Sequence, residues 1–179
     1  MKQLSGPLYV VTGLLCDFLF AIVVGAMLGM TTPVYSLAGF IRTPIVCLGP
    51  SLLVLTGVAT IIGGPRRITH YLLTSAVVLA GLAAWSVPKI GWQATTWLFL
   101  YPEAASLLGA VVILLVVRRF WIAALIGTLL SSPFFLYATV ASIKGWWATG
   151  SFSATEVWLI APTAMLLLCF VSSLRVRTD

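Results

Sequence analysis

Charged residues are scarce in this chain of 179 residues. They make up 8% of the sequence, as four acidic residues and ten lysines and arginines, whereas hydrophobic residues make up 61%. A water-soluble domain typically has about 25% charged residues, which cover its surface. The composition therefore excludes an ordinary soluble domain and predicts a protein that lies in the lipid bilayer.

Histidine and cysteine, which hold many protein-bound metals and haem groups, are also scarce. The single histidine, His70, cannot by itself supply a bis-histidine haem site or an HExxH zinc site. No CxxC pair occurs among the three cysteines, which we interpret as small buried hydrophobic residues: Cys16, Cys47 and Cys169. P-loop, GxGxxG, GxSxG and EF-hand patterns are missing as well. The sequence therefore indicates no metal site and no particular cofactor.

Long apolar segments occupy nearly all of the chain. A helix that crosses the roughly 30 Å hydrocarbon core of a bilayer needs about 20 mostly apolar residues. Six segments fit this description, at about residues 8–30, 44–62, 68–88, 97–117, 120–143 and 157–174. They leave no room for a soluble domain. The predicted fold class is an all-α integral membrane protein, in which residues 1–179 form a single bundle of six transmembrane helices.

The joint between the fourth and fifth segments contains neither glycine nor proline. It consists of Arg118 and Arg119 between two apolar runs. One continuous helix across it would be too long for a single span and would place two arginines at its middle, where charge is costly. We therefore expect a tight helical hairpin at the membrane surface.

The arrangement of positive charge predicts the orientation of the bundle. If the N-terminus is cytoplasmic, seven lysines and arginines lie on that side and three on the other, as the positive-inside rule requires for an even number of spans. The cytoplasmic residues are Lys2, Arg66, Arg67, Arg118, Arg119, Arg175 and Arg177; the others are Arg42, Lys89 and Lys144. We expect both termini in the cytoplasm and the plasma (inner) membrane as the location. Because topology explains the net charge of +6, the expected partner is the bilayer and not nucleic acid.

Tryptophan is concentrated at the outer ends of the predicted spans. Only Trp121 falls at an inner boundary, and the outer residues are Trp85, Trp92, Trp97, Trp146, Trp147 and Trp158. Tryptophan is enriched at membrane interfaces, so these residues can be anchors of loops that lie flat on the bilayer. The alternative is an aromatic rim for an apolar ligand, a quinone or a partner helix.

Two acidic residues, Asp17 and Glu103, lie well inside predicted spans. A charge at the centre of a spanning helix costs about 2.5–3.5 kcal/mol on translocon scales, so such residues usually face a cavity or a partner. Counting about 1.5 Å per residue puts Asp17 near the midplane and Glu103 in the outer half, with a difference in depth of about 6–8 Å. We predict that Asp17 and Glu103 are binding residues. The alternative is a neutral, protonated carboxyl that is hydrogen-bonded to a neighbouring helix.

Small residues surround Asp17 at a spacing of four. The series is Gly13, Asp17, Ala21, Gly25 and Gly29. Residues at this spacing form one ridge of a helix, and small side chains on it allow close approach of a neighbouring helix. Asp17 is therefore expected to project from a packed seam and not toward lipid.

Two further candidates are associated with Glu103. Ser106 follows it by three residues and shares its face of the helix. Arg42, expected in the first outer loop, is long enough to reach down toward Glu103 or to extend instead toward the membrane surface.

The fifth span contains a band of hydroxylated residues in which Ser131 and Ser132 precede Pro133. Proline removes a backbone donor and frees a carbonyl, which one of these hydroxyls or a trapped water can satisfy. Such a band either contributes polar groups to the binding site or simply joins helices. We include both serines among the candidate site residues.

These features favour a membrane protein that binds or transports a small solute or a proton through a site in the outer half of the bundle. In size and number of spans the chain resembles the substrate-capturing subunits of energy-coupling-factor transporters, a resemblance of architecture alone. One alternative is a non-catalytic subunit of a larger membrane complex, in which the small-residue ridge and the outer tryptophans contact other subunits. A second alternative is a membrane enzyme that acts on a lipid or isoprenoid, with Asp17 and Glu103 as general acid and base.

Overall fold

A computed structural model describes residues 2–31, 37–62, 68–117, 119–150 and 154–176. Within these ranges the side chains of residues 2–4, 20–31, 37–43, 68, 98, 148–149, 154–159 and 176 are not described. The described chain is helical except at Gly91, Arg119 and Gly150, and it contains no strand. Its elements are α1 (Lys2–Thr31), α2 (Leu37–Ile62), α3 (Ile68–Ile90), α4 (Trp92–Thr95), the π-helix η1 (Thr96–Leu100), α5 (Tyr101–Val117), α6 (Phe120–Thr149) and α7 (Ala154–Val176).

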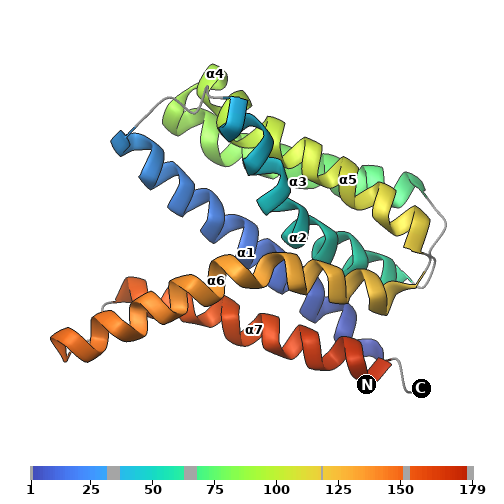
Figure 1. Cartoon of the computed structure of the whole chain (residues 1–179). Coiled ribbons are helices and arrows are strands. Elements are labelled where there is room, and N and C mark those ends of the chain that lie inside the picture. The colour runs from blue at the N-terminus through green and yellow to red at the C-terminus, as the bar shows by residue number, and fades with distance from the viewer. Residues whose placement is uncertain (1, 32–36, 63–67, 118, 151–153, 177–179) are drawn as a thin grey trace.

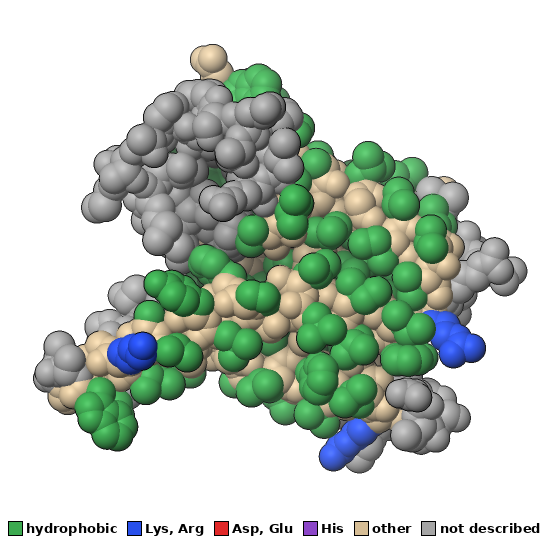
Figure 2. Space-filling model, in the orientation of Figure 1, with side chains coloured by type: hydrophobic (Ala, Val, Ile, Leu, Met, Phe, Trp, Pro, Cys, Tyr) green, Lys and Arg blue, Asp and Glu red, His purple; other side chains and the backbone are tan. Residues whose placement is uncertain are grey.

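Each of the six expected apolar segments lies in a helix. Three stretches are long and apolar enough to cross a membrane, namely Pro44–Ile62, Thr69–Ile90 and Phe120–Trp147. Shorter apolar helical stretches among the described residues are Ser5–Leu19, Tyr101–Val117 and Ile160–Arg175. Figure 2 shows a mostly hydrophobic surface, with lysine and arginine side chains near the edges of the visible face. By length and composition, the helices indicate a membrane protein.

The helices extend beyond the apolar segments, because a helix satisfies its own backbone whether lipid or water surrounds it. Most of the expected loop at 89–96 is helical, and α6 continues to Thr149. Glycines with positive φ occur where two of these helices end: Gly91, with a φ of 80°, follows α3, and Gly150, with a φ of 70°, caps α6. The expected hairpin is present, since α5 ends at Val117 and α6 begins at Phe120.

Helix α2 is at the centre of the bundle (Figure 1). It packs extensively against α1, α5 and α6, while α7 packs against α6 and α1. Helix α3 has much less contact with its neighbours, and it lies at the periphery beside α2 and α5. The two chain ends lie at the same end of the bundle (Figure 1), where the Tyr9 hydroxyl donates to Ser172 Oγ over 3.5 Å.

Close glycine contacts join α2 to its neighbours. A Cβ added at Gly13 would lie 2.7 Å from the Pro50 carbonyl oxygen, and one added at Gly57 would lie 2.6 Å from the Gly6 carbonyl oxygen. Gly13 is the first member of the small-residue ridge that precedes Asp17. At Gly13 the backbones of α1 and α2 therefore approach closely, as the ridge predicts. The contacts of Ala21, Gly25 and Gly29 lie outside what the structure describes.

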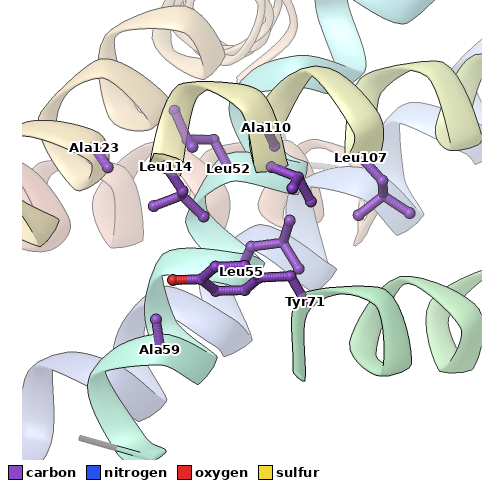
Figure 3. Packing of buried hydrophobic residues seen from close by; sticks show 9 residues of the cluster. Leu52, Leu55, Ala59, Tyr71, Leu107, Ala110, Leu114 and Ala123 are labelled. Atoms are coloured by element: carbon purple, nitrogen blue, oxygen red, sulfur yellow. The ribbon is translucent and has the colours of Figure 1, made fainter. Parts of the chain in front are cut away.

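Two hydrophobic clusters flank α2. The first joins α2, α3, α5 and α6, and Figure 3 shows Tyr71 of α3 reaching the side chains of α2 and α5. Its residues are Leu52, Leu55, Ala59, Tyr71, Leu107, Ala110, Val111, Leu114 and Ala123. The second joins α1, α2, α6 and α7 through Tyr9, Cys16, Leu19, Leu53, Ala124, Phe135, Leu166 and Cys169. Cysteines 16, 47 and 169 are all buried and free, as expected of small hydrophobic residues.

Candidate functional site

A cavity of about 630 Å³ lies among α1, α2, α3, η1 and α5. Its lining is mainly aliphatic and aromatic, and both Asp17 and Glu103 contribute to it. The two acids are 86 positions apart in the sequence and come from different helices, so the fold brings them to one place.

Asp17 is positioned by the glycine contact one turn before it. Gly13 holds α1 against the backbone of α2 at Pro50, so the next turn of α1 lies beside α2. Cys16 then faces the second hydrophobic cluster, and Asp17 faces the cavity. Both carboxylate oxygens of Asp17 are buried, and neither has a hydrogen-bond partner among the described residues. A buried oxygen without a hydrogen-bond partner costs stability.

Glu103 follows a change of helix type. In η1 the Tyr101 amide donates to the Thr96 carbonyl, five residues earlier, and Pro102 has no amide hydrogen to donate. Phe99 in η1 and Glu103 in α5 are four residues apart and both line the cavity. Single π-turns inside α-helices are frequent at functional sites.

Glu103 takes part in a network with two serines. Ser51 Oγ lies 3.0 Å from Glu103 Oε1 and 2.8 Å from Ser106 Oγ, and Ser106 Oγ lies 2.8 Å from the Glu103 carbonyl oxygen. All three contacts are buried, and three hydrogen bonds need three hydrogens, whereas the two hydroxyls carry only two. Ser51 Oγ donates to Glu103 Oε1 and Ser106 Oγ donates to the Glu103 carbonyl oxygen, so the third contact, between the two hydroxyls, lacks a hydrogen of its own.

Three aromatic rings lie at one end of the cavity. Phe18 and Trp85 meet edge to face with centroids 5.9 Å apart, and Trp85 and Phe99 do so at 6.1 Å. Lys89 Nζ lies 3.9 Å from the centre of the Trp85 ring. Trp85 thus belongs to the cavity, whereas the described outer tryptophans outside it are exposed, namely Trp92, Trp97, Trp146 and Trp147. The side chain of Trp158 lies outside the described residues.

The remaining candidates are distributed differently. Ser106 reaches the cavity region through Ser51, but Ser131 lies at the contact of α6 with Gly49 of α2, where it donates to the Gly127 carbonyl over 2.8 Å. Ser132 lines a separate cavity of about 190 Å³ between α6 and α7.

Ser132 also satisfies the backbone carbonyl that Pro133 leaves without a donor. Its Oγ donates over 3.0 Å to the carbonyl of Leu129, the group four residues before the proline that loses its usual donor. Arg42, expected in a loop, lies within α2, because the helix begins at Leu37. The side chain of Arg42 lies outside the described residues.

Sequence reasoning did not select Ser51, Phe99 or Cys47, which the structure places at or beside the acids. The available signal for Ser51 was a hydroxyl directly after Pro50 in the most apolar span. That hydroxyl contacts Glu103 and Ser106.

Both charged side chains that line the cavity, Asp17 and Glu103, are acidic. Within the described part of the chain, no lysine, arginine or histidine lines it, and no three His, Cys, Asp or Glu side chains gather in a way that would hold a metal ion. The site can therefore take a proton, a cation or a neutral hydrogen-bond donor. The chain matches no known family, and comparisons with curated proteins and with solved structures also gave no match.

Proposed function

We propose that this protein is a six-span protein of the plasma (inner) membrane that binds and carries a proton or a small cationic or polar solute at Asp17 and Glu103. Both termini lie in the cytoplasm, and the site lies in the outer half of the bundle. Three observations support this topology. Three helices are long and apolar enough to span a membrane, the two chain ends lie at the same end of the bundle (Figure 1), and the predicted bias of positive charge favours a cytoplasmic N-terminus.

One observation carries the proposal. Asp17 of α1 and Glu103 of α5 line the same apolar cavity, and the oxygens of Asp17 are buried without a partner among the described residues. Acids inside membrane-spanning segments usually mark ion or proton pathways. Here the two acids occur as a pair, and the oxygens of Asp17 lack hydrogen-bond donors among the described residues. A bound proton or a ligand that donates a hydrogen bond would supply the missing donor.

Transport also requires that the site opens to each side in turn. Helix α3 forms one wall of the cavity through Thr74, Val78 and Leu82 but packs weakly against the rest of the bundle. Elements with few packed contacts open at low free-energy cost. In this proposal α3 moves while α1, α2 and α5, which are closely packed, hold the two acids.

The test uses the full-length protein in liposomes that contain a trapped pH-sensitive dye. Under an imposed membrane potential, wild-type liposomes should acidify faster than empty ones. Asp17→Asn and Glu103→Gln preserve shape but cannot carry a proton, so each should lower the rate toward that of empty liposomes. Ser132→Ala, in the separate cavity of α6 and α7, is the matched control and should behave as wild type.

Infrared difference spectra between high and low pH provide the binding measurement. Wild type should show carboxyl bands that each of the two substitutions removes. If both variants keep the wild-type flux and the wild-type bands, the carboxyl pair is not the site and the proposal is wrong.

A further inference from the structure

We infer that the solute is an amphiphilic organic cation, with an ammonium head and an apolar chain, which enters the cavity sideways from the bilayer between α1 and α3. This inference rests on the proposed function, because it names the class of solute that the Asp17 and Glu103 site takes. The position of the opening, the charge of the cavity and the shape of its lining support it.

The cavity opens along the gap between α1 and α3. Leu14 and Phe18 of α1 line the cavity but are 43% and 48% exposed, and Leu73 and Val77 of α3 line it but are 65% and 64% exposed. Side chains with both properties lie at the mouth of a cavity. Helices α1 and α3 have far less contact with each other than either has with the body of the bundle. In a spanning bundle this mouth faces the acyl chains.

The charge of the cavity selects a cation. Asp17 and Glu103 line it together, and the described lining contains no basic side chain. An ammonium head places a positive charge against the carboxyl of Asp17, whose oxygens have no partner among the described residues. The rings of Phe18, Trp85 and Phe99 lie in the same lining, and aromatic faces attract cations. Lys89 already lies over the ring of Trp85.

The shape of the lining accommodates an apolar chain beside that head. Beyond Asp17 the cavity continues along α1 to Val10 and along α2 to Val58, with aliphatic side chains on both. Val10 and Phe18 are eight residues apart, which corresponds to about 12 Å along a helix axis. The volume of about 630 Å³ also falls within the range of about 300–1,000 Å³ that is usual for small-molecule sites. A small inorganic ion would leave most of this space empty.

Binding is measured with radiolabelled dodecyltrimethylammonium on the full-length protein in lipid nanodiscs, with empty nanodiscs subtracted. Wild type should bind it saturably, whereas Asp17→Asn should bind it at least about tenfold more weakly, as expected for loss of a charge-assisted contact. Glu103→Gln is a second, independent variant with the same expectation, and Ser132→Ala should bind as wild type. Tetramethylammonium, which has no chain, and dodecanol, which has no charge, should both compete poorly.

Two results overturn the inference. One is equal competition by dodecanol, which would assign the cavity to a neutral lipid-like molecule. The other is unchanged affinity in both Asp17→Asn and Glu103→Gln, which would place the cation elsewhere.

The route of entry between α1 and α3 is tested by cross-linking these two helices to each other. In a variant with the three native cysteines replaced by alanine, the pair Phe18→Cys and Trp85→Cys is cross-linked to join α1 and α3. Binding from the bilayer should become several-fold slower and should recover on reduction. The pair Tyr9→Cys and Ser172→Cys joins α1 to α7 away from the gap, and its cross-link should leave the rate unchanged. Equal rates before and after cross-linking of the first pair would exclude sideways access.

Failure of this inference is distinguishable from failure of the proposed function. If proton flux depends on Asp17 and Glu103 but dodecyltrimethylammonium does not bind, the site serves protons and only the inference is wrong. If neither flux nor binding depends on the two acids, both are wrong.

Discussion

Asp17 and Glu103 are both acids inside the helix bundle, but their surroundings differ. Glu103 is 5% exposed and contacts Ser51, which in turn contacts Ser106. Asp17 has two buried oxygens for which the described residues offer no partner. A buried polar group without a hydrogen bond costs stability, whereas a partnered one costs much less. At the residue scale, Asp17 is therefore a position at which the fold gives up stability.

Replacing each acid by leucine should change the stability of the protein in opposite directions at the two positions. Asp17→Leu removes an unpartnered carboxyl, so the free energy of unfolding of the empty protein should rise by about 1–3 kcal/mol. Glu103→Leu removes the carboxyl oxygen to which Ser51 donates, so it should lower the free energy of unfolding by about 1–3 kcal/mol. Thermal unfolding of the detergent-solubilised chain, monitored by size-exclusion chromatography, measures the stability of each variant relative to wild type. Equal destabilisation by both substitutions would mean that Asp17 has a structural partner and is not held for a ligand.

At the scale of elements, the bundle depends on glycines that let helices touch through their backbones. Gly57 of α2 lies against the backbone of α1 at Gly6, and Gly49 of α2 lies against Gly127 of α6. Gly81 of α3 differs, because a Cβ added there meets no atom within 4 Å. The closely packed helices are those that hold the two acids, and the helix with open space beside its glycine is the one that lines the mouth.

The same change from glycine to alanine should therefore have opposite effects on stability at Gly57 and at Gly81. Gly57→Ala forces α1 and α2 apart and should lower the free energy of unfolding by about 1–3 kcal/mol, the usual cost of overpacking. Gly81→Ala meets open space and should raise it by about 0.5–1 kcal/mol, because alanine loses less backbone entropy than glycine in a helix. Thermal unfolding of the two variants under identical conditions measures both changes. A stabilising Gly57→Ala would contradict the close contact.

The sequence predicted the positions of the helices better than their ends. An apolar run marks the part of a helix that lies in hydrocarbon, but helix formation depends on the backbone, so α2 begins at Leu37 and α6 continues to Thr149. The π-turn before Glu103 was not predicted, since Pro102 indicates a missing donor without specifying how the helix accommodates it. The close approach at Gly13 was predictable, because the spacing of small residues directly encodes it.

At the scale of the whole molecule, the meeting of Asp17 and Glu103 depends on how helices pack, which a single sequence specifies only through many weak contacts. Residue counting gives a position along each helix, but it gives neither the rotation of the helix nor its neighbours. Ser131 illustrates the difficulty: its hydroxyl has the chemistry of a binding residue, yet it lies where α6 meets α2 at Gly49. Hydroxyls that join helices and hydroxyls that bind ligands look alike in sequence.

Topology is a property of the whole molecule, and the proposed cytoplasmic placement of both chain ends can be tested directly. Single cysteines introduced as Lys89→Cys and Lys144→Cys, both at exposed positions, should react with a membrane-impermeant maleimide added to intact cells. Arg119→Cys, exposed at the hairpin between α5 and α6, should react only after the membrane is permeabilised. The three native cysteines are buried, so unmodified protein provides the background. Labelling of Arg119→Cys in intact cells would reverse the orientation and place the mouth of the cavity at a different depth from the one proposed.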